Sequence, residues 1–120
     1  MSSKNILIVE DELIISLIIE KMVKNMGHRV VGKVRSGEEA IYSARSLKPD
    51  LILMDIRLQG EIDGIEAMTE IRKLEDIPVI YITGNTDQMY RNRIQRSEYL
   101  DFLTKPVTFD DLTRSFSQAS

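Results

Sequence analysis

The sequence has no cysteine, only three prolines and a single histidine. Without cysteine the chain can form no disulfide bond, thiolate metal site or thiol-based active site, and this composition is compatible with the cytoplasm. The glycines form no nucleotide-binding loop either, because there is no G-x-x-x-x-G-K-[ST] pattern and no G-x-G-x-x-G after the first predicted strand. Chemistry that depends on a bound nucleotide is therefore not expected.

Long apolar runs and a strong excess of one charge are missing as well. The most apolar stretch, residues 13–19, is interrupted by Ser16 and is too short to span a bilayer. Residues 1–5 lack the layout of a signal peptide. The formal net charge of −3 gives no broad electrostatic reason to expect binding to nucleic acid or anionic lipid. We therefore expect a cytoplasmic protein with neither a nucleic-acid nor a membrane partner.

The residues that are present are typical of one globular domain. The 120 residues are 42% hydrophobic and 29% charged, and we find no repeat, low-complexity segment or linker among them. A single domain over residues 1–120 is predicted. Five apolar segments alternate with five segments of helical pattern. The predicted strands are 6–9, 29–34, 51–55, 78–82 and 100–103, and the predicted helices are 13–26, 36–47, 65–74, 86–97 and one from about 109.

This alternation predicts the fold class. Strands that alternate with helices form a parallel sheet with helices on both faces, because the crossover connections are right-handed. Five such units indicate an α/β protein with the flavodoxin-like, doubly wound (βα)5 fold and strand order 2-1-3-4-5. The strand at 29–34 is expected at an edge of this sheet.

The most informative segment is an apolar run, Leu51–Met54, that leads directly into Asp55. A continuous apolar run of this length predicts a strand buried on both faces. Asp55 would then lie at the carboxyl end of a central strand, where an α/β sheet opens its binding crevice. A carboxylate in that position is unfavourable unless a cation or hydrogen bonds satisfy it.

Other polar residues follow the remaining central strands. Glu10 and Asp11 follow the first strand, Thr83 follows the fourth and Lys105 follows the fifth. The carboxyl ends of parallel strands share one edge, so these side chains are expected to converge on Asp55. Carboxylates, a hydroxyl and one ammonium group suit Mg²⁺ (or Mn²⁺) together with a phosphoryl group. Since carboxylates can form aspartyl-phosphates, Asp55 is the candidate nucleophile.

Five segments of the chain together carry a family resemblance. All five occur in the order and spacing of the receiver domain of two-component response regulators, which the chain resembles over essentially its whole length. They are Ile6–Glu12, Leu51–Asp55, Asp63–Glu66, Pro78–Thr83 and Phe102–Pro106.

The resemblance implies a role for each site residue. Asp55 would accept a phosphoryl group from a phosphohistidine on a sensor histidine kinase or a histidine phosphotransfer domain. Asp11 and Asp55 would bind Mg²⁺, with Glu10 acting through water and the backbone carbonyl of Arg57 as a further ligand. Lys105 would pair with the phosphoryl group. The protein would then be a phosphorelay switch and no enzyme beyond Mg²⁺-dependent self-phosphorylation and slow autodephosphorylation.

The same resemblance implies a switch and an output surface. The Thr83 hydroxyl would move toward the phosphoryl group and the Phe102 ring would follow inward. This would change the face made by the fourth helix, fifth strand and fifth helix, where an output domain or protein, or a second copy of the chain, could bind. Arg57 and Asn85 lie two residues after Asp55 and Thr83, where the family tunes the lifetime of the phosphate.

The first predicted helix is apolar over more of its surface than one stripe requires. Its excess apolar residues either belong to the core or form a contact site. The resemblance favours a kinase-docking surface there, because exposed apolar patches usually mark interfaces. The candidate residues are Ile14, Ile15, Ile18 and Pro106.

Two further features have ordinary interpretations. His28 follows the end of the first helix and is expected to cap it or to face solvent. Arg91, Arg93 and Arg96 of the fourth helix are expected to form a solvated face, with a partner or dimer surface as the alternative.

Three other functions remain to be weighed. A receiver-like module that only binds protein would be expected to lack Asp55, Asp11 or Lys105, and all three are present. An aspartyl-phosphate phosphatase would carry a second acid two residues after the nucleophile, where this chain has Arg57. A flavodoxin-like electron carrier shares the fold class, but Glu10 and Asp11 would repel the phosphate of its cofactor unless a metal were bound.

Overall fold

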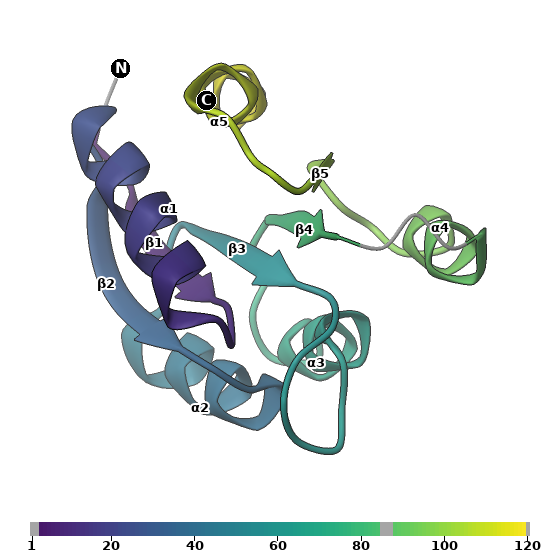
Figure 1. Cartoon of the computed structure of the whole chain (residues 1–120). Coiled ribbons are helices and arrows are strands. Elements are labelled where there is room, and N and C mark those ends of the chain that lie inside the picture. The colour runs from purple at the N-terminus through teal and green to yellow at the C-terminus, as the bar shows by residue number, and fades with distance from the viewer. Residues whose placement is uncertain (1–2, 85–87, 120) are drawn as a thin grey trace.

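A computed structural model of the chain describes residues 3–84 and 88–119. The elements alternate as the sequence predicts (Figure 1). The strands are β1 Asn5–Val9, β2 Arg29–Val34, β3 Leu51–Asp55, β4 Val79–Thr83 and β5 Asp101–Thr104. The helices are α1 Leu13–Asn25, α2 Gly37–Leu47, α3 Gly64–Ile71, α4 Gln88–Gln95 and α5 Phe109–Ser117.

The strands form one parallel sheet with the order β2-β1-β3-β4-β5, so the predicted fold class is confirmed. Strand β2, which was predicted at an edge of the sheet, is an edge strand and pairs with β1. Helices α1 and α5 cover one face of the sheet and α2, α3 and α4 cover the other (Figure 1). Two apolar clusters result, because successive residues of each strand point to opposite faces.

The central strands β1, β3 and β4 are long apolar runs because both of their faces are covered. All five residues of β3 and of β4 are buried, and so are the last four of β1. A buried strand offers no solvated face for polar residues, so polar groups collect where the strand ends. This placement puts Glu10, Asp55 and Thr83 at one edge of the sheet.

Side-chain caps fix where several helices begin. Ser36 accepts a hydrogen bond from the Glu39 backbone N–H at 3.1 Å, as its capping-box spacing predicts. Asp63 and Thr108 begin α3 and α5 with complete capping boxes. The end of α3 differs most from the prediction. Helix α3 ends at Ile71 rather than Leu74, because the chain turns there to return Ile77 to the core. The predicted start of α4 lies outside the described residues.

His28 contradicts its sequence-based interpretation. The expectation that it caps α1 or faces solvent is wrong, because the side chain is buried. Its Nδ1 accepts a hydrogen bond from the Lys4 backbone N–H at 3.0 Å, and its ring centroid lies 5.0 Å from that of Phe116 in α5. Burial lowers the pKa of His28 from its ordinary value, and the nearby Lys4 charge lowers it further. Phe116 is far away in the sequence, so no local pattern indicated this contact.

Within residues 3–84 and 88–119, no helix has both the length and the apolar character needed to cross a membrane.

Candidate functional site

The predicted acidic residues converge at the carboxyl edge of the sheet. Strands β1 and β3 are neighbours with Val9 opposite Met54, so the residues that follow, Glu10 and Asp55, lie side by side. Asp11 completes the group. Ligand oxygens of the three carboxylates lie within 4.8 Å of one another. The sheet thus brings together residues that are up to 45 positions apart in the chain, as the strand-end argument predicts.

Lys105 reaches into this acidic group from the end of β5. Its Nζ lies 2.9 Å from Glu10 Oε1 and 3.1 Å from Asp55 Oδ2. The backbone positions the side chain, because the Lys105 N–H donates to the Thr83 carbonyl at 2.9 Å. One ammonium group therefore bridges two carboxylates. The buried Thr83 ends β4, which lies between β3 and β5 in the sheet order.

Burial makes these carboxylates unusual. Glu10 is 1% exposed and Asp55 is 4% exposed. Burial raises the pKa of Glu10 from its ordinary 4.5 to about 7. The negative charge of Asp55 adds to the rise, while the contact with Lys105 and the hydrogen bond from the Glu12 backbone N–H oppose it. Burial also raises the pKa of Asp55, against the opposing attraction of Lys105. For Lys105, burial lowers the pKa, but the contacts with Glu10 and Asp55 outweigh this and leave it raised. The site therefore holds excess negative charge that one lysine does not fully compensate.

The donor set fits a hard divalent cation. Glu10 Oε2 accepts a hydrogen bond from the Glu12 backbone N–H at 3.0 Å. Glu10 Oε1, although buried and close to Lys105, makes no hydrogen bond of good geometry. A buried carboxylate oxygen without a hydrogen bond is unfavourable unless another group satisfies it. Carboxylate oxygens are the ligands that Mg²⁺ prefers, so Glu10, Asp11 and Asp55 are suitable to hold it.

The segment between β3 and α3, residues 56–63, packs closely against the site. The Gly64 N–H donates to the Ile56 carbonyl at 2.8 Å. A Cβ atom on Gly64 would lie 2.3 Å from the Asp55 carbonyl oxygen, so only glycine fits there. On the other side, the Glu61 N–H donates to the Glu38 carboxylate of α2 at 3.1 Å. This segment contains Arg57, whose side chain is exposed.

Two contacts near the site have no signal in the sequence. Arg93 of α4 makes a two-pronged ion pair with Asp63, and the Arg35 guanidinium donates to the Asp11 carbonyl at 3.2 and 3.3 Å. Arg93 was expected on a solvated or partner-binding face, and instead its side chain is partly buried against Asp63.

The predicted switch residues lie on adjacent strands. Thr83 is buried at the end of β4, and Phe102 of β5 is half-buried against the cluster covered by α2, α3 and α4. Phe102 lies opposite Tyr81 in the strand register. Asn85, predicted to tune the phosphate lifetime, lies outside the described residues.

The predicted docking residues are mostly accessible. Ile14 is 74% and Ile18 is 47% exposed, and Pro106 is also exposed, whereas Ile15 is half-buried against the core. Leu13 and Leu17 extend the exposed apolar face of α1 beyond the predicted residues.

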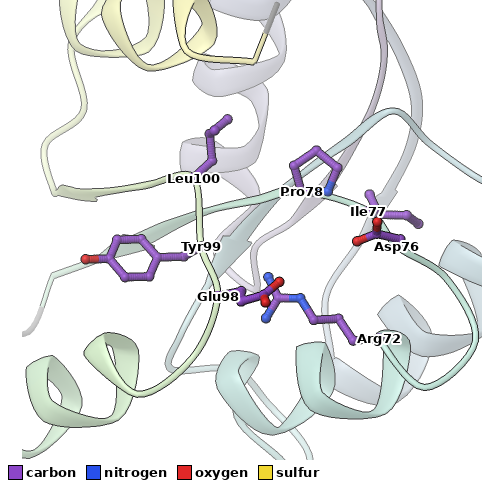
Figure 2. A pocket seen from close by; sticks show the side chains of 7 residues that line it. All are labelled: Arg72, Asp76, Ile77, Pro78, Glu98, Tyr99 and Leu100. Atoms are coloured by element: carbon purple, nitrogen blue, oxygen red, sulfur yellow. The ribbon is translucent and has the colours of Figure 1, made fainter.

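A separate cavity of about 330 Å³ lies away from this site. Figure 2 shows its lining side chains where the chain leaves α3 and enters β4 and where it enters β5, at the opposite edge of the sheet from Asp55. None of the predicted site residues that the structure describes lines it. The lining residues are Arg72, Asp76, Ile77, Pro78, Glu98, Tyr99 and Leu100.

Comparison with known proteins agrees with this geometry. The response regulator receiver domain family matches residues 6–117. The transcriptional regulatory protein PdtaR of Mycobacterium tuberculosis is 31% identical over 109 residues, which are 91% of this chain and 53% of PdtaR. The phyllosphere-induced regulator PhyR of Methylorubrum extorquens is 34% identical over 115 residues, which are 95% of this chain and 42% of PhyR. The chain spans about half the length of these curated relatives.

Solved structures give the same result. The signal receiver domain of a modulated diguanylate cyclase from Desulfovibrio desulfuricans G20 has a TM-score of 0.92 at 34% identity, with 98% of this chain and 94% of that chain covered. The receiver domain of a sensor histidine kinase from Pseudomonas aeruginosa PAO1 has a TM-score of 0.86 at 34% identity, with 98% of both chains covered, and it holds a magnesium ion in its active-site cleft. As its motifs predicted, the chain belongs to the response regulator receiver domain family, whose members are signalling switches of two-component systems rather than catalytic enzymes.

Proposed function

We propose that Asp55 accepts a phosphoryl group from a phosphohistidine on a sensor histidine kinase or a histidine phosphotransfer domain. The observation that carries this proposal is the bridge from Lys105 to Asp55 and Glu10, beside a third carboxylate from Asp11. This arrangement supports the proposal, because one crevice would then hold a nucleophile, a cation for the phosphoryl oxygens and a set of metal ligands. The cytoplasmic location expected from the sequence is part of the proposal.

The reaction is a phosphoryl transfer to a carboxylate. One Asp55 oxygen attacks phosphorus as the N–P bond of the phosphohistidine breaks, and the departing imidazole keeps the electron pair and takes a proton from solvent. Glu10, Asp11 and Asp55, with the Arg57 carbonyl, would hold Mg²⁺, which when bound neutralises negative charge on the phosphoryl oxygens and the carboxylates. The Lys105 ammonium stays within reach of the new phosphoryl oxygens and neutralises a further charge.

The switch follows from the change of charge. An acyl phosphate on Asp55 presents new acceptor oxygens close to Lys105, and the Thr83 hydroxyl at the end of β4 can donate to them. Movement of Thr83 opens space for the half-buried Phe102, two residues before the end of β5. The altered face of α4, β5 and α5 would then be recognised by an output domain, an output protein or a second copy of the chain.

The partner would dock on the exposed apolar face of α1. Ile14 and Ile18 supply apolar surface close to the acidic crevice, and Pro106 follows Lys105 at the end of β5. Burial of such a face against a helical partner would bring the phosphohistidine to Asp55.

Intact mass after incubation with acetyl phosphate and Mg²⁺ tests the proposal. We expect one phosphoryl adduct that is labile to hydroxylamine, requires the metal and disappears in Asp55→Asn. If no adduct forms, titration with beryllofluoride, a stable phosphoryl mimic, distinguishes rapid hydrolysis from a fold used only for protein binding. Failure to bind beryllofluoride with Mg²⁺ would reject the phosphoacceptor function.

A further inference from the structure

The ion pair between α4 and the start of α3 has unusually complete geometry. Arg93 Nη1 donates to Asp63 Oδ2 at 2.6 Å and Nη2 donates to Asp63 Oδ1 at 3.1 Å. The side chains are 33% and 19% exposed, so water screens the pair only in part. The Arg93 guanidinium also lies 5.9 Å from the centre of the Tyr90 ring. A planar fork held on a carboxylate fixes orientation as well as distance.

Asp63 is connected directly to the backbone of the phosphoacceptor. Its Oδ1 also accepts the Glu66 N–H at 2.9 Å, and its own N–H donates to Glu66, which fixes the first turn of α3. The next residue, Gly64, lies against the Asp55 carbonyl and donates to the Ile56 carbonyl. A displacement of Asp63 would therefore move the backbone that leads out of Asp55.

The segment 56–63 is held from two sides. On one side, Glu38 of α2 accepts a hydrogen bond from the Glu61 N–H, and a β-bridge pairs Gln59 with Ser36, the residue that caps α2. On the other side, Arg93 holds its end at Asp63. The segment contains Arg57, whose carbonyl is proposed above as a metal ligand. Of these contacts, only the Arg93 pair comes from α4, an element of the proposed output face.

We propose that Arg93 is a positioning residue: through Asp63 it holds the 56–63 segment in the conformation that binds the metal and the phosphoryl group, and so couples α4 to the site. This inference rests on the proposed function of Asp55. The coupling is reciprocal. Metal and phosphoryl binding strengthen the Arg93–Asp63 pair, and a partner that removes Arg93 from Asp63 weakens metal binding.

The test uses variants that separate this pair from the helix cap. Arg93→Gln removes the guanidinium. Asp63→Asn removes the charge but keeps a side-chain oxygen that caps α3 well. Arg91→Gln makes the same charge change on an exposed neighbour that forms no ion pair within the described part of the chain. Mg²⁺ affinity is measured from amide chemical shifts of the unphosphorylated proteins, and the adduct lifetime from intact mass.

We expect Arg93→Gln and Asp63→Asn each to weaken Mg²⁺ binding by roughly threefold to tenfold, the range typical of coupling through such a contact. The double variant should resemble either single one, Arg93→Lys should recover only part of the affinity, and Arg91→Gln should match the wild type. A merely structural role would lower the melting temperature without changing Mg²⁺ affinity, and that result would overturn the inference. Failure of the wild-type protein to bind beryllofluoride with Mg²⁺ would instead reject the proposed function, so the two failures are distinguishable.

Discussion

Replacing Glu10 by glutamine is expected to stabilise the metal-free protein at pH 8. Glutamine has the shape of protonated glutamate without its charge, and Glu10 is 1% exposed beside the Asp55 carboxylate. The substitution removes a buried negative charge from a group whose single ammonium, Lys105, remains paired with Asp55 at 3.1 Å. The metal-free variant should therefore be more stable than the metal-free wild type, although it loses metal affinity. This is expected where a functional site holds unfavourable charge.

The pKa of Glu10 sets the magnitude of this stabilisation and the direction in which it changes with pH. Burial raises it from 4.5 to about 7, so as the pH falls the folded protein takes up this proton before the unfolded chain does. The free energy of unfolding consequently decreases as the pH rises from 4.5 toward 7, and the whole penalty is present above that. The pKa difference already includes the opposing contact with Lys105, and it corresponds to about 3 kcal/mol at most. We expect a gain in the free energy of unfolding of about 1–3 kcal/mol.

Urea unfolding measures this effect. Wild type, Glu10→Gln and Asp11→Asn are compared at pH 5 and pH 8, with EDTA or with saturating Mg²⁺. Asp11→Asn makes the same charge change at a half-buried position without a Lys105 ion pair. The gain of Glu10→Gln should be largest at pH 8 in EDTA, shrink at pH 5, and be offset by Mg²⁺, which stabilises only the folded protein that binds it.

The opposite result would refute the reasoning. If Glu10→Gln is less stable than wild type at pH 8 in EDTA, the Glu10–Lys105 ion pair outweighs the cost of burying Glu10. A gain that does not depend on pH would show that titration of Glu10 is not its cause.

Other expectations are testable on the same protein. Gly64→Ala should destabilise the fold by about 3 kcal/mol or more, because its Cβ would lie 2.3 Å from the Asp55 carbonyl oxygen. Gly37→Ala is the matched control, since its Cβ would meet a side chain, that of Ile62 at 2.6 Å, rather than backbone. An equal shift of the urea midpoint in both variants would contradict this steric argument. Lys105→Ala should still form the acyl phosphate but switch poorly, so normal phosphate-dependent amide shifts in α4 and β5 would remove its switch role. Ile14→Ser should leave the melting temperature almost unchanged, because the side chain is 74% exposed, yet slow phosphotransfer from the kinase by roughly tenfold while labelling by acetyl phosphate stays normal.

The fold and the acidic crevice could be predicted because their signals are local. The central strands β1, β3 and β4 are apolar runs, which indicates that they are buried. The parallel order then places the ends of β1, β3 and β5 at one edge of the sheet. Glu10, Asp55 and Lys105 meet for this topological reason. The helix cap at Ser36 could also be predicted from the sequence, because the Glu39 N–H that donates to it lies only three residues away.

The tertiary structure alone decided which contacts join distant elements. His28 follows a helix end in the sequence, but α5 packs over it with Phe116, so it is buried. Arg93 lies on a polar helix, but its partner Asp63 is 30 positions earlier and only the packing of α4 brings them together.

The raised pKa of Glu10 is likewise a property of the folded structure. It depends on burial and on the arrangement of Asp55 and Lys105, none of which a residue's neighbours in the chain determine. The sequence by itself determined the order of elements and the chemistry available at the strand ends. Distances, burial and charge balance were decided only when the helices packed on the sheet, because those quantities depend on residues that are remote in the chain.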